Sequence, residues 1–218
     1  MRHGCSYVPI SSRLVADSRN RARGSRPCDD GAVSERSAPI LIVSGPSGAG
    51  KTTVGRVLAA TFDRSVHIQA DHLMFSVVSG WIEPWLPEAA HQNAVLGGAM
   101  AAAALQFARG GYAVVLDGDF FPEALDELAP WASRHDVPLH YAVLRPDLST
   151  CLARVRQRRS GDPEDFDAFA QLHTRFEKLG EREPNVVDAS GTPDEVAEAV
   201  LDAFRSGRLQ VRPPSDRT

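Results

Sequence analysis

The sequence predicts an α/β fold, a three-layer sandwich in which a five-stranded parallel sheet carries helices on both faces. Two observations lead to this prediction. Five short apolar runs alternate with longer segments of helical pattern over residues 39–206, and this alternation is typical of parallel sheets that are covered on both faces. In addition, 43% of the 218 residues are hydrophobic and 24% are charged, which is the ordinary balance of a folded globular domain.

The five predicted strands are apolar runs of three to six residues that are bounded by turn residues. In chain order they are residues 40–43, 66–69, 112–116, 139–144 and 185–187. The first run precedes a glycine-rich turn, and the fourth is the longest. The second leads to Asp71, the third to Asp117 and the fifth to Asp188, so an acidic residue follows three of the five strands.

Six helices are expected between and after these strands. They are residues 52–60, 87–109, 123–134, 147–158, 165–179 and 192–204. Pro87 suits the first turn of the long second helix, and Asp147 is expected to cap the fourth. Residues 192–195 (Thr-Pro-Asp-Glu) combine an N-cap threonine, a proline at the first helical position and a glutamate at the third, which predicts a capping box.

Residues 1–38 differ in composition from the rest of the chain. They hold seven arginines against four acidic residues, a net charge of +3, which leaves −7 for the remainder of a chain whose total is −4. The segment is rich in Ser, Gly and Arg and has no periodic apolar pattern, so we expect a disordered N-terminal tail. The domain is then expected to span residues 39–206, and residues 207–218 to form a flexible C-terminal tail.

Composition also bears on partners and location. No stretch approaches ~20 uninterrupted apolar residues, so no membrane partner is expected, and the near-neutral net charge gives no reason to expect a nucleic-acid partner. The apolar run at residues 7–10 is too short for an export signal. Three cysteines leave one unpaired, which fits a reducing compartment. We therefore expect a cytoplasmic protein, monomeric or homodimeric.

Residues 45–52 read Gly-Pro-Ser-Gly-Ala-Gly-Lys-Thr and fit the pattern of a phosphate-binding P-loop (Walker A). Glycines let backbone N–H groups point at phosphate oxygens, and the helix that follows adds its positive N-terminal end. The residues expected to bind the nucleotide are Gly45, Pro46, Ser47, Gly48, Ala49, Gly50, Lys51, Thr52 and Thr53. Lys51 would reach the β- and γ-phosphates, and the Thr52 hydroxyl would help to hold Mg²⁺. The alternative is a glycine-rich turn that merely resembles the motif.

Acidic residues at the carboxyl ends of strands are the next candidates, because open parallel sheets bind ligands at that edge. Asp117 ends an apolar run and is expected to orient Mg²⁺, with Asp119 as a second candidate. Asp71 suits a carboxylate that accepts a proton from a substrate hydroxyl, or that holds the hydroxyl in line for phosphoryl transfer. The alternatives are a strand-to-loop turn for Asp117 and a helix N-cap for Asp71. The role of the neighbouring His72 is left open.

Arginines gather after the fourth strand, and Arg154 and Arg158 lie four residues apart on one predicted helix face. Such a basic flap would stabilise the charge of the transferring phosphoryl group and exclude water, so both are candidate catalytic residues. The alternative is a solvated helix face. Trp81 and Trp85, in the proline-rich connection before the long helix, either form an apolar wall for an acceptor or pack that connection onto the domain.

With these residues the chain resembles the P-loop small-molecule kinases, a group that includes chloramphenicol phosphotransferase-like, gluconate kinase-like and shikimate kinase-like enzymes. The resemblance covers residues 39–206 and is most specific at the phosphate-binding loop. It implies the P-loop NTPase fold with strand order 2-3-1-4-5, a lid near residues 155–165, and ATP with Mg²⁺ as the donor. Asp71 matches the position of the catalytic aspartate in chloramphenicol phosphotransferase-like enzymes. Some relatives carry a second carboxylate directly afterwards, where this chain has His72.

The sequence therefore favours an ATP-dependent kinase that phosphorylates a hydroxyl of a small molecule, a metabolite or an antibiotic. Two alternatives stay open. One is a nucleotide-dependent switch or ATPase module that binds a partner. The other keeps the chemistry but takes a nucleoside or a nucleotide sugar as acceptor.

Overall fold

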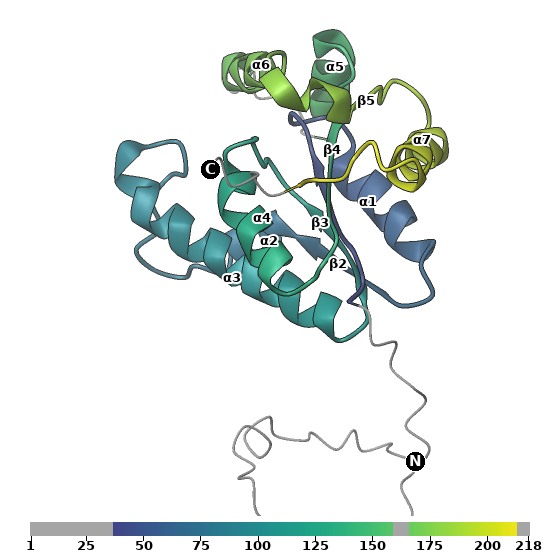
Figure 1. Ribbon diagram of the computed structural model, residues 1–218. Helices are drawn as coiled ribbons and strands as arrows, with labels where there is room; N and C mark the ends of the chain where they lie inside the picture. The colour runs from purple at the N-terminus through teal and green to yellow at the C-terminus, as the bar shows by residue number, and fades with distance from the viewer. Residues whose placement is uncertain (1–36, 159–165, 213–218) are drawn as a thin grey trace, which may run out of the picture. The chain divides into compact units, whose positions relative to one another are not determined.

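Residues 37–158 and 166–212 are described by the computed structural model (Figure 1). Most of the expected N-terminal tail, most of the expected lid and residues 213–218 lie outside these ranges.

The sheet has five parallel strands in the order β2-β3-β1-β4-β5, which confirms the expected fold and strand order. The strands are β1 (Ile40–Ser44), β2 (Ser65–Gln69), β3 (Ala113–Asp117), β4 (Leu139–Leu144) and β5 (Val186–Val187). Every residue of β1, β3 and β4 is buried. Such continuous apolar runs are expected where a parallel sheet is covered on both faces.

Helices cover both faces of the sheet, as Figure 1 shows. In order they are α1 (Lys51–Ala60), α2 (Ala70–Met74), the 3-10 helix η2 (Pro87–Ala89), α3 (Ala90–Arg109), α4 (Ala124–Arg134), α5 (Leu148–Arg158), α6 (Phe166–Arg175), the 3-10 helix η4 (Gly180–Asn185) and α7 (Pro193–Arg205). Leu41 and Val43 of β1 pack against α1 and α7, whereas Ile40 and Ile42 pack against α3 and α4. The alternation along one strand therefore supplies two separate cores.

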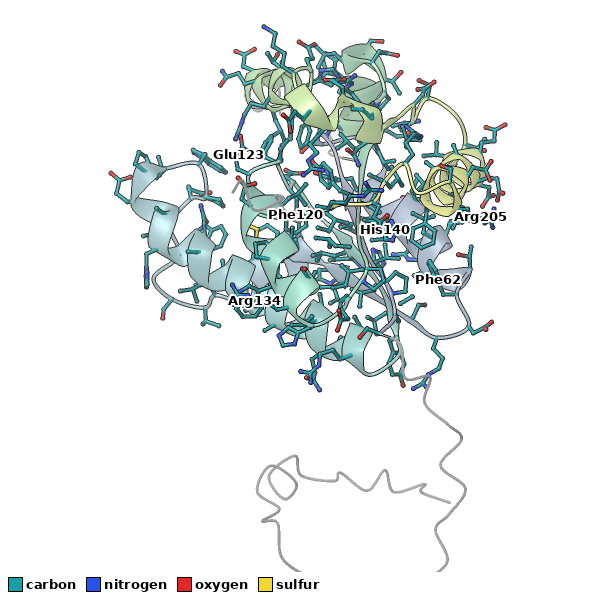
Figure 2. The ribbon with its side chains drawn as sticks, viewed as in Figure 1. Phe62, Phe120, Glu123, Arg134, His140 and Arg205 are labelled. Atoms are coloured by element: carbon teal, nitrogen blue, oxygen red, sulfur yellow. The ribbon has the colours of Figure 1, made fainter. Side chains whose placement is uncertain are left out.

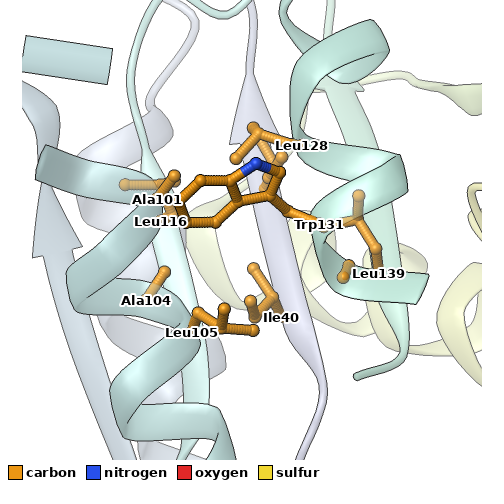
Figure 3. A pocket seen from close by; sticks show the side chains of 10 residues that line it. Ile40, Ala101, Ala104, Leu105, Leu116, Leu128, Trp131 and Leu139 are labelled. Atoms are coloured by element: carbon orange, nitrogen blue, oxygen red, sulfur yellow. The ribbon is translucent and has the colours of Figure 1, made fainter. Parts of the chain in front are cut away.

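Local packing on the two faces leaves little free space. On the α7 face the ring of Phe204 lies 6.0 Å from that of Phe62 and 4.3 Å from that of His140; Phe62 and His140 are labelled in Figure 2. Burial lowers the pKa of His140 to about 4, so this histidine is a neutral core residue. On the opposite face Trp131 lies across an apolar space of about 10 Å³ (Figure 3), which offers no polar partners for a water molecule.

Two predicted helix starts are confirmed. Thr192 and Glu195 form the expected capping box, in which the Thr192 N–H donates to Glu195 Oε2 at 2.8 Å and the Glu195 N–H donates to Thr192 Oγ1 at 3.4 Å. Asp147 accepts from the Thr150 N–H at 2.8 Å at the start of α5. The expected single helix at residues 165–179 instead ends at Arg175, and η4 follows it.

The C-terminal boundary differs from the expectation. Leu209 is fully buried, the Tyr141 N–H donates to the Leu209 carbonyl at 2.9 Å, and the Val211 N–H donates to the Leu139 carbonyl at 2.8 Å. Because β5 pairs only with the end of β4, these residues take the free edge of the first half of β4. A flexible tail from residue 207 was therefore wrong for residues 207–212.

Within residues 37–158 and 166–212, no helix combines the length and the apolar character that crossing a membrane would require.

Candidate functional site

The phosphate-binding loop connects β1 to α1 and is held by backbone from two later segments. Gly45 and Gly48 have φ angles of 139° and 85°, in the region that L side chains rarely adopt. A Cβ on Gly45 would lie 2.1 Å from the Leu144 carbonyl oxygen, and one on Gly48 would lie 2.3 Å from the Cys151 carbonyl oxygen. Only glycine fits at either position, and the loop therefore wraps the N-terminus of α1, where backbone N–H groups can bind an anion.

Lys51, the first residue of α1, folds its side chain back over this loop. Its Nζ donates to the carbonyls of Gly45 at 2.8 Å and Pro46 at 3.1 Å. It also lies 2.7 Å from Asp119 Oδ1. The ammonium group is thus held directly above the loop by carbonyl oxygens and by one carboxylate, the position from which a lysine reaches bound phosphates.

Thr52 and Asp117 meet at the end of β3. Asp117 is buried, and its Oδ1 accepts from the Thr52 hydroxyl at 3.3 Å. The other oxygen, Oδ2, lies 2.6 Å from Nε2 of His67 on β2. His67 was not predicted from the sequence, because a histidine in an alternating strand gives no sign of a partner 50 residues away.

The Thr52 and Asp117 oxygens fit Mg²⁺, a hard cation that proteins hold through one or two carboxylates together with substrate phosphates and waters. In the described ranges no three His, Cys, Asp or Glu side chains are arranged to hold a metal ion by themselves. A magnesium ion at this position would therefore need phosphate oxygens as further ligands.

Asp71 lies in the first turn of the short helix α2 and lines the same cavity as the loop. The N-cap of α2 is Gln69, and Asp71 is the second residue inside the helix, so the alternative of an N-cap for Asp71 was wrong. The pKa of Asp71 is raised first by burial and then by Asp119, while Lys51 acts in the opposite direction.

One cavity of about 490 Å³ joins these groups. It is lined by residues 47–54, Asp71, residues 117–119, Arg154, Val155, Gln157, Phe169, Ala189, Gly191, Pro193 and Val196. Seven of the nine residues expected to bind the nucleotide line it; Gly45 and Pro46 do not, and their carbonyls instead accept from Lys51. The volume falls in the range of small-molecule sites.

Arg154 of α5 lines the cavity. Its Nη1 donates to the carbonyls of Ala189 at 3.1 Å, Ala49 at 3.4 Å and Gly48 at 3.5 Å. It therefore connects α5 to the phosphate-binding loop and to the loop that follows β5. Arg158 is the last residue of α5, and the position of its side chain lies outside the description.

Trp81 and Trp85 are absent from the described lining of the cavity. The Trp81 ring lies 6.0 Å from that of Phe75, and Trp85 is 76% exposed. The connection that carries them is held by α3, because the Gln92 side chain both donates to and accepts from the Ile82 backbone at 2.7 and 2.9 Å. Asn93 adds a donor to the Pro84 carbonyl at 2.8 Å.

The sheet order and the loop between β1 and α1 together define the fold of the P-loop small-molecule kinases, as the sequence resemblance implied. A family model described as an AAA domain matches residues 40–179. The chain therefore belongs to the family that this model describes.

Solved structures with this fold include proteins of several activities. The tunicamycin resistance protein of Deinococcus radiodurans is 18% identical, with 81% of this chain and 99% of that chain covered and a TM-score of 0.57. A gluconokinase from Sinorhizobium meliloti 1021 is 21% identical, with 78% and 94% covered and a TM-score of 0.54. The APS kinase CysC of Mycobacterium tuberculosis, in complex with AMPPNP and APS, is 16% identical, with 78% and 99% covered and a TM-score of 0.57. A comparison with curated proteins gives no match.

Proposed function

We propose that this chain is an ATP-dependent kinase that transfers the γ-phosphate to a hydroxyl of a small molecule. The observation that carries the proposal is that Asp71 lines the same cavity as the phosphate-binding loop, Thr52 and Asp117. A donor site and a carboxylate able to hold an acceptor hydroxyl thus share one space, which in-line phosphoryl transfer requires.

The donor end would be organised by the loop and by the side chains of Lys51, Thr52, Asp117 and Arg154. Backbone N–H groups of residues 47–52 would bind phosphate oxygens, and Lys51 would leave Asp119 for the β- and γ-phosphates. Thr52 and Asp117 would hold Mg²⁺, which when bound neutralises charge that develops on the transferring group. Arg154 already contacts carbonyls of Gly48 and Ala49, so we assign it to shaping this end and to stabilising phosphate charge; Arg158 follows on the same helix as the second candidate.

The acceptor end would be organised by Asp71. Its carboxylate would accept a hydrogen bond from the acceptor hydroxyl, orient the oxygen toward the γ-phosphate and take the proton as transfer proceeds. Because its pKa is raised, Asp71 is a stronger base than an ordinary aspartate and is better suited to accept this proton.

The charges around Asp71 also bear on the acceptor. Among the described residues, the charged groups that act on this carboxyl are Asp119, Asp117, Lys51 and His72. Three carboxylates including Asp71 itself therefore stand against Lys51 and His72, the two groups that act in the opposite direction on its pKa, and Lys51 is committed to the nucleotide once it binds. An acceptor that carries its own carboxylate, sulfate or phosphate would be repelled, so we propose a neutral polyhydroxylated acceptor.

The test is ATP turnover against a panel of hydroxylated compounds in matched neutral and anionic forms. Asp71→Asn should lower phosphoryl transfer by about 10²–10⁴-fold and leave ATP affinity nearly unchanged, because the proposal assigns this carboxyl to the acceptor hydroxyl and not to the phosphates. Asp126→Asn, an exposed aspartate of α4, is the matched control. If Asp71→Asn transfers phosphate at the full rate, Asp71 is excluded as the base. If the chain hydrolyses ATP but phosphorylates no compound of the panel, the proposed kinase activity is contradicted.

A further inference from the structure

We propose that His67 is a positioning residue for the magnesium site, whose imidazole fixes the Asp117 carboxylate in the orientation that faces Thr52. This inference rests on the proposed function and adds a residue to it that the phosphate-binding motif does not contain. It would act through Asp117 and would touch neither nucleotide nor acceptor.

The first argument is the geometry of the three side chains. Each oxygen of Asp117 has its own partner: Oδ1 accepts from the Thr52 hydroxyl at 3.3 Å, and Oδ2 lies 2.6 Å from His67 Nε2. The side chains of His67 and Asp117 are only 13% and 6% exposed. The carboxylate is therefore held at both ends inside the domain and cannot rotate without losing one of its contacts.

The second argument is the way the sheet brings these groups together. Val66 and Ile68, the neighbours of His67 on β2, pack on the core formed with α3 and α4. Alternation along the strand therefore directs His67 to the other face, under α1. The parallel register pairs Gln69 with Asp117 and His67 with Val115. His67 therefore lies two residues before the partner of Asp117, and its side chain extends along the strand direction to that carboxylate.

The third argument is a glycine in the middle of α1. A Cβ on Gly55 would lie 2.8 Å from His67 Nε2 and 3.5 Å from Asp117 Oδ2. Glycine is disfavoured inside helices relative to alanine, and here it leaves the space that the imidazole occupies. The absence of a side chain at Gly55 of α1 therefore makes room for the imidazole of His67 on β2.

The chemical consequence follows from the behaviour of metal ligands in general. A carboxylate that holds a metal is itself hydrogen-bonded in most sites, and loss of that outer partner lowers metal affinity by about 10–100-fold. With Nε2 as the donor, His67 holds one oxygen of Asp117 and leaves the other directed at Thr52. A bare carboxylate at the same place would sample other rotations.

The test measures nucleotide affinity of the full chain by calorimetry with AMPPNP, once with Mg²⁺ and once with EDTA. His67→Leu removes the donor and should reduce the gain in affinity from Mg²⁺ by about 10-fold or more, with affinity in EDTA unchanged. His67→Gln, whose amide nitrogen can donate from nearly the same place, should keep most of that gain. His135→Leu, an exposed histidine at the end of α4, is the matched control.

A second variant keeps the test decisive if His67→Leu does not fold. Gly55→Ala retains both His67 and Asp117 but forces the imidazole away, so it should lose the Mg²⁺ gain as well. In a His67→Ala background the same change should have no further effect, because the space is then free.

Three results would overturn the inference: an undiminished Mg²⁺ gain in both His67→Leu and Gly55→Ala, an equal loss of affinity with and without Mg²⁺, or no rescue by His67→Gln. The equal loss would mark His67 as a packing residue only. If the unaltered chain binds no nucleotide under either condition, the proposed function itself fails, and this inference fails with it.

Discussion

Replacing Asp119 with asparagine should make the chain bind ATP more tightly. Lys51 lies 2.7 Å from Asp119 Oδ1 before any nucleotide arrives, so binding has to break this ion pair before the ammonium can reach the phosphates. The Asp119 side chain is 43% exposed, and ion pairs of such exposure contribute about 0.2–1 kcal/mol. Asp119→Asn removes that competition and should raise ATP affinity by about 1.4- to 5-fold.

The assay is calorimetric titration with AMPPNP and Mg²⁺ at low and at high salt, with Asp126→Asn as the control. Because salt screens an exposed pair, the difference between Asp119→Asn and the unaltered chain should shrink as the salt concentration rises. A loss of about tenfold or more would refute the reasoning, since it would make Asp119 rather than Asp117 the carboxylate that holds Mg²⁺.

Three further predictions concern the loop, the acceptor end and the helix cap. Gly48→Ala should abolish detectable ATP binding, because its Cβ would overlap the Cys151 carbonyl oxygen; retained binding in a filter assay would contradict the loop geometry. The raised pKa of Asp71 should place the acid limb of the pH–kcat profile above the usual aspartate pKa near 3.9, with activity lost as pH falls. Asp119→Asn should move that limb to lower pH, and an unmoved limb would show that Asp119 does not influence the titration of Asp71. Thr192→Ala removes the capping box of α7 and should cost about 1 kcal/mol of stability, measured as a lower Tm with kcat unchanged.

The donor half of the site follows from local sequence, and this explains why it could be predicted. The loop, Lys51 and Thr52 are consecutive, and Asp117 ends an apolar strand that the sheet order places beside β1. Gly45 and Gly48 are required because a side chain there would overlap the Leu144 and Cys151 carbonyl oxygens. The motif predicts these glycines although it does not identify the residues that they contact.

Features that depend on contacts between distant segments were not predicted. His67 is meaningful only through Asp117. Arg154 was singled out from the sequence as a candidate catalytic residue, but its contacts with the carbonyls of Gly48, Ala49, Ala189 and Gly191 were not predicted. Leu209 and Val211 are two apolar residues in a polar segment, too few to predict a strand. Their backbone nevertheless forms hydrogen bonds with the free edge of β4. Arg145, directly after β4, pairs with Glu183 at 2.9 Å and donates to the Phe176 carbonyl, a structural role.

The phosphate-binding loop and the connection at residues 75–86 are supported in different ways, and this has a practical consequence. The phosphate-binding loop is wedged between backbone of β4 and α5, so changes there disturb the centre of the domain. The connection at residues 75–86 follows Asp71 and is held largely through Gln92 and Asn93. Because no residue of that stretch is among the described lining of the cavity, its exchange for another sequence, with Gln92 and Asn93 retained, should leave nucleotide binding intact.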